Sequence, residues 1–186
     1  MARDAQATRR KLLEAATAEF SAYGIAGARV DRIAAGAGCN KAMIYSYFGN
    51  KDQLFDAVFD AIVTGTVTEV PIDAADLPRY AGKLFDRYHA HPEALRLATW
   101  YALERGGREE PPAMLAKSTA HKVAAIREAQ NDGTLPTRFD AEDLLTLVIH
   151  LSTTGSFELS APKRDDALLA RRRASIVAAV ACLIAG

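Results

Sequence analysis

Two lysines stand at the beginnings of expected helices in the first third of the chain. Lys41 follows Asn40 and Lys51 follows Asn50, so each lysine falls in a first helical turn. A cation is disfavoured there by about 0.3–1 kcal/mol, because the helix dipole already presents positive charge at that end. An anion bound at each helix start, such as a DNA phosphate, would turn this cost into a gain. Two solvated lysines are an equal alternative, so the pattern indicates a phosphate-binding surface without establishing it.

The segment between Val30 and Gly49 has the spacing of a helix-turn-helix. Ala34 is small enough for two helices to cross, and Gly38 gives the turn a permissive backbone. Ile44 can then face back from the second helix to the first. An ordinary helical hairpin is the alternative, so the spacing favours a helix-turn-helix without requiring one.

The second of these helices, expected over residues 41–48, has two unlike faces. Ile44 and Phe48 are four residues apart and point to the core, whereas the opposite side carries short side chains. Small residues let a helix approach base edges in a major groove, and groups at its borders reach phosphates. Tyr45 and Tyr47 lie about 200° apart around the helix, so at least one should be exposed. Base contacts are expected from Ala42, Met43 and Ser46, and backbone contacts from Lys41, Tyr45 and Tyr47.

Enzyme and metal motifs are missing from the sequence. It has no glycine-rich phosphate loop, no GxSxG and no HExxH, and none of its four histidines stands beside an apparent nucleophile. The pair His89 and His91 lacks a third ligand nearby and is expected to be a helix end. We therefore expect no catalytic residues, no metal and no cofactor.

Composition narrows the class of protein further. The 186 residues are 49% hydrophobic and 25% charged, which is typical of a globular chain, and no apolar stretch is long enough for a membrane span. Residues 1–51 hold eight basic and four acidic residues, against 15 and 19 in the remainder, which suggests a polyanionic partner for the N-terminal part. Cys39 and Cys182 form no disulfide framework. A cytoplasmic protein is expected.

The pattern of caps, prolines and apolar positions predicts an all-α fold. Asp31 begins a short helix, Asn50 caps a long one, and Pro71 marks a break where we place the domain boundary. The expected domains are 7–67, with the helix-turn-helix at 30–49, and 72–186. About nine helices are expected, over residues 8–23, 31–36, 41–48, 51–67, 77–90, 92–106, 111–131, 140–159 and 164–185.

The segment from Thr8 to Phe59 resembles the DNA-binding domain of TetR-family transcriptional regulators. The most specific part of the match is Tyr45-x-Tyr47-Phe48 followed by Lys51-Asp52-Gln53-Leu54-Phe55. The resemblance implies that the first three helices bind DNA and that the remainder binds a small effector and dimerises. It implies DNA contacts for Arg29, Asn40, Lys41, Ala42, Met43, Tyr45, Ser46, Tyr47 and Lys51.

Two positions depart from the family pattern. Arg29 stands where the family usually has a threonine that caps the second helix, so a hydroxyl cap is lost and Asp31 is expected to replace it in part. Whether Arg29 reaches DNA is left open. Cys39 replaces an aliphatic residue and is expected to be a small core residue, because no basic neighbour would lower its pKa.

The C-terminal region is expected to supply a dimer interface and an effector pocket. Small residues on its last two helices allow close contact between helices, as a bundle between two subunits requires, although packing within one chain is the alternative. The expected dimer interface comprises Leu144, Leu147, Val148, Leu151, Gly155, Ile176, Val177, Val180 and Leu183. Pocket candidates, of which about a third should line a mostly apolar cavity, are Tyr88, Trp100, Tyr101, Met114, His121, His150 and Phe157.

These patterns together predict a homodimeric regulator that binds double-stranded, palindromic operator DNA. It is expected to be a repressor that a small apolar effector releases from the operator, although activation is left open. One alternative is a helix-turn-helix protein that binds DNA without an effector. A weaker one is a helical ligand-binding or catalytic protein that has lost DNA binding.

Overall fold

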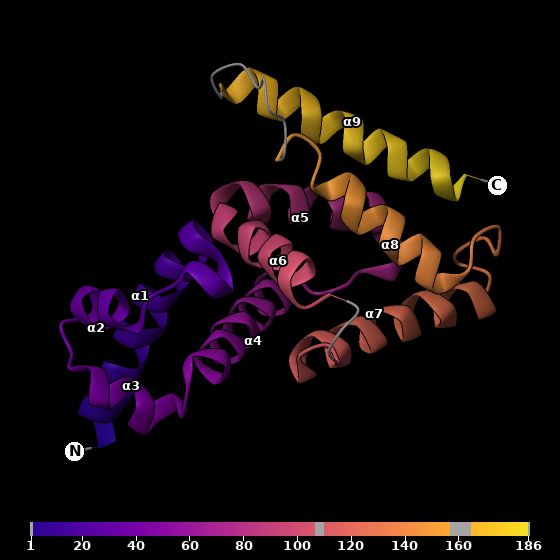
Figure 1. The fold of residues 1–186 in the computed structure, drawn as a ribbon. Coiled ribbons are helices and arrows are strands. Elements are labelled where there is room, and N and C mark those ends of the chain that lie inside the picture. Colours follow the sequence, from indigo (N-terminus) through magenta and orange to yellow (C-terminus); the bar gives the residue numbers. More distant parts are fainter. Residues whose placement is uncertain (1, 107–109, 157–164, 186) are drawn as a thin grey trace. The chain divides into compact units, whose positions relative to one another are not determined.

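The computed structural model describes residues 2–106, 110–156 and 165–185, with side chains from residue 5 onward. Within these residues it contains nine α-helices, one short 3-10 helix (Ala74–Asp76) and no strand, which confirms the expected all-α fold (Figure 1). The helices are α1 Ala2–Gly27, α2 Val30–Ala37, α3 Lys41–Phe48, α4 Lys51–Glu69, α5 Leu77–Ala90, α6 Pro92–Glu104, α7 Ala113–Asn131, α8 Ala141–Ser152 and α9 Asp166–Ile184.

Local capping rules account for most helix starts. The Asn50 side chain accepts a hydrogen bond from the Gln53 amide at 2.8 Å, and Asp76 accepts one from the Arg79 amide at 3.0 Å. Pro78 follows Asp76 in the first turn of α5, where its missing amide hydrogen costs nothing. These starts agree with the expectation from the sequence.

Two helices differ from their expected bounds by more than two residues. Helix α1 begins at Ala2 rather than at Thr8, and it continues past Gly24 to Gly27. Gly24 has φ 73° and ψ −178°, so it kinks the helix instead of ending it. Helix α8 ends at Ser152, earlier than residue 159, and the rest of that expected helix lies partly outside the described residues.

The chain divides into two compact units, and the division does not follow chain order. Unit 1 comprises residues 1–64 and 93–115, and unit 2 comprises residues 65–92 and 116–186. Helix α6 therefore belongs with the N-terminal helices, although the sequence placed it in the second domain. The domain limits 7–67 and 72–186 remain a proposal, to which we return below.

The core of unit 1 holds α1–α4 and α6 together. Helix α2 packs on α1 and α3 packs on α2. Phe20 of α1 meets Phe55 of α4 edge to face, with ring centroids 5.3 Å apart, and both rings are fully buried. Ile44 of α3 and Leu97 of α6 complete this core. The inner face of the short helix α3 is thus packed into the buried core of unit 1.

Unit 2 is built on α5, with α8 and α9 packed against it (Figure 1). Its largest buried side chains are Tyr80, Phe85 and Leu84 of α5, with Ile126 of α7. Arg173 of α9 also pairs with Asp86 of α5 at 2.8 Å. No helix among the described residues is long and apolar enough to cross a membrane.

Candidate nucleic-acid interface

The turn between α2 and α3 closes in a way that fixes where α3 begins. Gly38 adopts φ 64° and ψ 31°, and its amide donates to the Ala35 carbonyl while the Cys39 amide donates to the Ala34 carbonyl. This pair of bonds is a Schellman motif, which needs a left-handed residue that glycine supplies without strain. Asn40 then caps α3 by accepting from the Met43 amide at 3.0 Å. The helix-turn-helix expected from the spacing is present.

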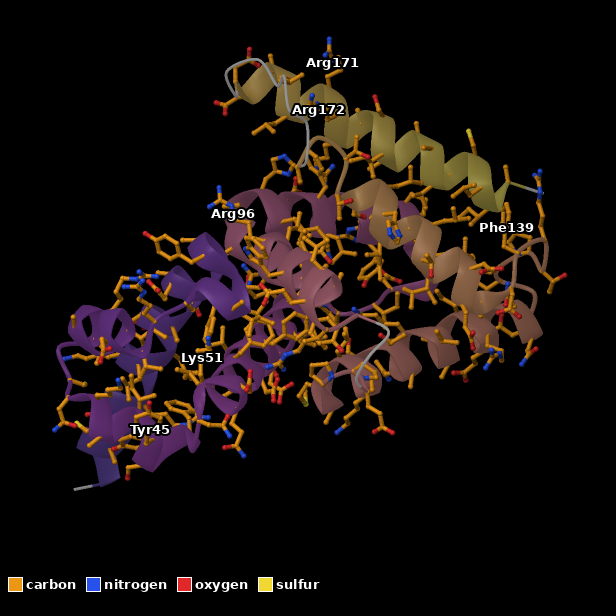
Figure 2. The ribbon with its side chains drawn as sticks, viewed as in Figure 1. Tyr45, Lys51, Arg96, Phe139, Arg171 and Arg172 are labelled. Atoms are coloured by element: carbon orange, nitrogen blue, oxygen red, sulfur yellow. The ribbon has the colours of Figure 1, made fainter. Side chains whose placement is uncertain are left out.

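Helix α3 turns one side to the core and leaves the other open. Ile44 and Phe48 are buried, whereas Lys41, Ala42, Tyr45 and Ser46 are exposed. We call these four residues the outward face of α3. Tyr45 is 45% exposed, so its ring and hydroxyl are open to a partner (Figure 2). A narrow helix with alanine and serine at its exposed centre is shaped to enter a major groove.

Met43 and Tyr47 lie at the borders of this face. Both are half-buried, and the Tyr47 ring packs against the unit 1 core, with its centroid 6.2 Å from that of Phe48. Of the two tyrosines, Tyr45 is therefore the exposed one that the helical spacing required. Tyr47 keeps only part of its surface available for a partner.

The two lysines at helix starts have partners within the protein. The Lys41 ammonium lies 3.0 Å from the Asp31 carboxylate, and this hydrogen bond raises the pKa of Lys41. The Lys51 ammonium donates to the carbonyls of Ala26 and Ala28, at 3.3 and 3.4 Å. The positions of these two lysines in first helical turns can therefore be explained without a bound anion. Lys51 is half-buried at the start of α4 (Figure 2), so its first role is to join α4 to the end of α1.

Glu19 holds the start of α2 from outside the helix, because its carboxylate binds the amide of the N-cap residue Arg29 and not an amide of the first turn, as a hydroxyl cap would. Its buried carboxylate accepts from the Arg29 amide at 2.9 Å and from Arg32 Nε at 2.7 Å. The side chains of Arg29 and Asp31 make no capping bond, so the expectation that Asp31 would replace the cap in part was wrong. The Arg29 side chain is exposed and stays a candidate for phosphate contact.

The Glu19 carboxyl makes the stability of unit 1 depend on pH. Burial alone would raise its pKa, but hydrogen bonds from Arg32 and from the Arg29 amide outweigh burial and hold the pKa below its ordinary value. A lowered pKa stabilises the fold above the pKa of the unfolded chain, and this stabilisation is lost as the pH falls through the folded-state value. Glu19→Gln should therefore destabilise the protein by about 1–2 kcal/mol at pH 7. Urea unfolding at pH 7 and pH 3 should show the gap between the two proteins closing at pH 3, and a gap that stays constant would contradict this role.

The last residue of α6 and the residue after it hold the end of α1 and the start of α4 through two adjacent charged side chains. The Glu104 carboxylate accepts from the amides of Ile25 and Ala26, at 2.9 and 2.8 Å. The Arg105 guanidinium, 10% exposed, bonds Asp52 at 2.8 Å and Asp56 at 2.7 Å. Sequence reasoning missed both residues, because their partners lie 49–79 positions away. They are positioning residues for α1 and α4.

The structure distributes the pocket candidates over both units. Trp100, Tyr101 and Met114 lie in unit 1, where Trp100 donates to the Ser21 carbonyl at 3.3 Å and Tyr101 packs on Phe59. Tyr88 packs against the core of unit 2. His121 and His150 are exposed, and Phe157 lies outside the described residues. Tyr88 alone among them is seen to face the interior of unit 2.

The dimer candidates divide into core and surface residues. Leu144, Val148, Ile176 and Val180 are buried in the core of their own chain and have no surface left for a second copy. Leu147 is 37% exposed, and Leu151, Val177 and Leu183 are half-exposed. Gly155 lies in the turn after α8, with φ 83°. The surface available for dimerisation is therefore narrower than the sequence suggested.

Comparisons with known proteins agree with this arrangement. The family described as "Bacterial regulatory proteins, tetR family" matches residues 12–58, and "Tetracyclin repressor-like, C-terminal domain" matches residues 76–181. The chain is 43% identical over 152 residues to the HTH-type transcriptional repressor SCO4008 of Streptomyces coelicolor, covering 81% of this chain and 79% of that protein. It is 30% identical over 133 residues to the HTH-type transcriptional repressor NicS of Pseudomonas putida, covering 68% and 63%.

A solved structure extends the similarity to the fold. The transcriptional regulator SCO4942 from Streptomyces coelicolor superposes with a TM-score of 0.83 at 36% identity, covering 95% of this chain and 97% of that one. These matches are to regulators of transcription and not to enzymes. The chain belongs to the TetR family of transcriptional regulators, and it is a DNA-binding regulator.

Proposed function

We propose that the protein is a homodimeric repressor that places one α3 in each of two successive major grooves of its operator. The outward face of α3 carries this proposal, because it is exposed and small at its centre while the inner face of the same helix is locked into the core. Ala42 and Ser46 would lie against base edges, with Met43 at their border. Lys41, Tyr45, Tyr47, Asn40, Arg29 and Lys51 would contact phosphates. Such a protein would act in the cytoplasm, where bacterial chromosomal DNA lies.

We retain residues 7–67 as the DNA-binding domain and 72–186 as the domain for effector binding and dimerisation. Helix α6 then belongs to the second domain by its position in the sequence, although its side chains pack into the core of unit 1. For the dimer interface we propose the exposed and half-exposed residues of α8 and α9, namely Leu147, Leu151, Val177 and Leu183. Two copies are needed because a single helix in one groove gives weak binding.

Selection of bound sequences from random DNA tests the DNA-binding part of this proposal. A dimer should select an inverted repeat whose half-site centres lie about 10–10.5 base pairs, or a multiple of that spacing, apart. Selection of a single unrepeated site would contradict the dimer.

Release by an effector is tested on the selected operator. Small molecules extracted from the source cells are added to the complex while the anisotropy of the labelled DNA is measured. An extract fraction that both releases the DNA and raises the Tm of the free protein supports effector control. If no fraction does so, the protein binds its operator independently of an effector.

A further inference from the structure

The helix-turn-helix, residues 30–49, has two basic side chains, and both are paired with carboxylates. Its basic residues are Arg32 and Lys41, and its only acidic residue is Asp31. Arg32 binds Glu19, whose carboxylate is buried in unit 1. Lys41 binds Asp31, whose side chain is 75% exposed. The first ion pair is therefore partly buried, whereas the second lies on the surface of the helix-turn-helix.

The exposed pair between Asp31 and Lys41 is not what holds α3 in place. Ile44 and Phe48 pack α3 into the core of unit 1, and the Asn40 side chain caps its first turn. An ion pair with both partners exposed to solvent contributes little to the stability of a fold. This pair can therefore open without cost to the position of α3.

The Asp31 carboxylate lies where a bound phosphate would meet it. The proposed function puts an operator phosphate at Lys41, and the Asp31 Oδ1 atom is 3.0 Å from the Lys41 Nζ atom. A phosphate oxygen bonded to that ammonium at about 2.8 Å would lie within about 6 Å of the carboxylate. Charges are screened only over about 8 Å at physiological ionic strength. The phosphate and the carboxylate would therefore repel each other and compete for one ammonium.

This competition lowers what Lys41 contributes to DNA binding. A lysine that neutralises a phosphate releases about one condensed cation from the duplex, which makes binding depend on salt. If Lys41 leaves Asp31 for a phosphate, the freed carboxylate attracts a cation in exchange. If Lys41 stays with Asp31, no cation is released from the duplex. In both cases the net release of cations is smaller than an unpaired lysine would give.

We propose that Asp31 competes with DNA phosphates for Lys41 and so holds the affinity for DNA below the value that the same surface would otherwise reach. This proposal rests on the proposed function, in which α3 enters the major groove. Phosphate contacts carry no direct sequence information, so the effect extends to every duplex. Asp31 thus weakens binding to random DNA and to the operator alike.

Replacing Asp31 with asparagine is the first test, because it keeps the shape of the side chain and removes its charge. The full-length variant should bind both the selected operator and a random duplex several-fold more tightly. The plot of log affinity against log salt concentration should become steeper by about one for each copy bound. Glu128→Gln, at an exposed position of α7, makes the same change in net charge and should alter both quantities far less. Unchanged or weaker binding by Asp31→Asn would overturn the proposal.

A second test asks whether Asp31 acts through Lys41. In the Asp31→Asn background, Lys41→Met should lower the salt slope by about one for each copy bound, because the lysine there is free to meet a phosphate. In the wild type the same change should lower the slope clearly less. Equal decreases in the two backgrounds would show that the two residues do not compete, and would overturn the proposal. A purely structural role for the pair would change the Tm but not this difference in slopes.

The outcomes separate this proposal from the proposed function. If Asp31→Asn gains no affinity but the wild type still selects an inverted repeat from random DNA, the dimeric operator complex stands and the competition is wrong. If Asp31→Asn gains affinity for the random duplex through Lys41 but selection returns no inverted repeat, the competition stands and the dimeric operator complex is wrong.

Discussion

Replacing Ala42 with glutamate should weaken operator binding by about 30-fold or more while leaving the protein folded. Ala42 lies on the outward face of α3, where a carboxylate would meet the negative potential of the duplex instead of a base edge. Both copies in a dimer carry the change, so a loss of about 1–3 kcal/mol in each groove is counted twice. Titration of labelled operator, followed by anisotropy at fixed salt, measures this loss.

The same substitution is favourable for the helix itself. Ala42 is the second residue of α3, and an acidic side chain in a first turn interacts well with the helix dipole. The Tm should therefore stay unchanged or rise slightly. Ala98→Glu, at an exposed position of α6, makes the identical change in net charge and should weaken binding far less. Equal losses from the two variants would mean that only net charge matters and that α3 does not enter the groove.

Replacing Gly24 with alanine should cause a large loss of stability in unit 1. The backbone there has φ 73° and ψ −178°, a conformation that is almost restricted to glycine and costs other residues about 1–3 kcal/mol. An added Cβ would also lie 2.5 Å from a Glu104 carboxylate oxygen and 2.8 Å from the Trp100 ring. The carboxylate could then no longer cap Ile25 and Ala26. We expect a total loss of about 3–5 kcal/mol, measured by urea unfolding.

Gly38→Ala supplies the matched control for this prediction. Gly38 also has a positive φ, of 64°, but its ψ of 31° lies in the ordinary left-handed region, and an added Cβ would meet nothing within 4 Å. Its replacement should cost only about 1–2 kcal/mol. If Gly24→Ala were no more destabilising than Gly38→Ala, the contact with Glu104 and Trp100 would not hold the kink in place.

Local features of the sequence predicted the centre of the site well. The glycine at the turn, the asparagine cap and the four-residue spacing of Ile44 and Phe48 each act within one or two helical turns. The Tyr23 side chain shows the limit of such rules. Helical spacing puts it on one face with Leu12, Ala16 and Phe20, which are buried, but it is 53% exposed and stacks with Arg32, whose Cζ lies 4.3 Å from the ring centroid.

Partners distant in sequence could not be predicted. Lys51 is satisfied by carbonyls at the end of α1, and Arg105 by two aspartates of α4. Neither pairing follows from composition or spacing, because the fold alone brings those segments together.

Methylation interference on the selected operator tests the central claim most directly. Methylation of guanine N7 blocks only the major groove, so it reports where α3 lies without altering the protein. The account predicts two clusters of interfering guanines, with centres about one helical turn or a multiple of a turn apart. For Ala42→Glu, methylation in either cluster should no longer change binding, because the residual binding of that variant should not depend on sequence. Interference from adenine N3 in the minor groove alone, or a single major-groove cluster, would contradict it.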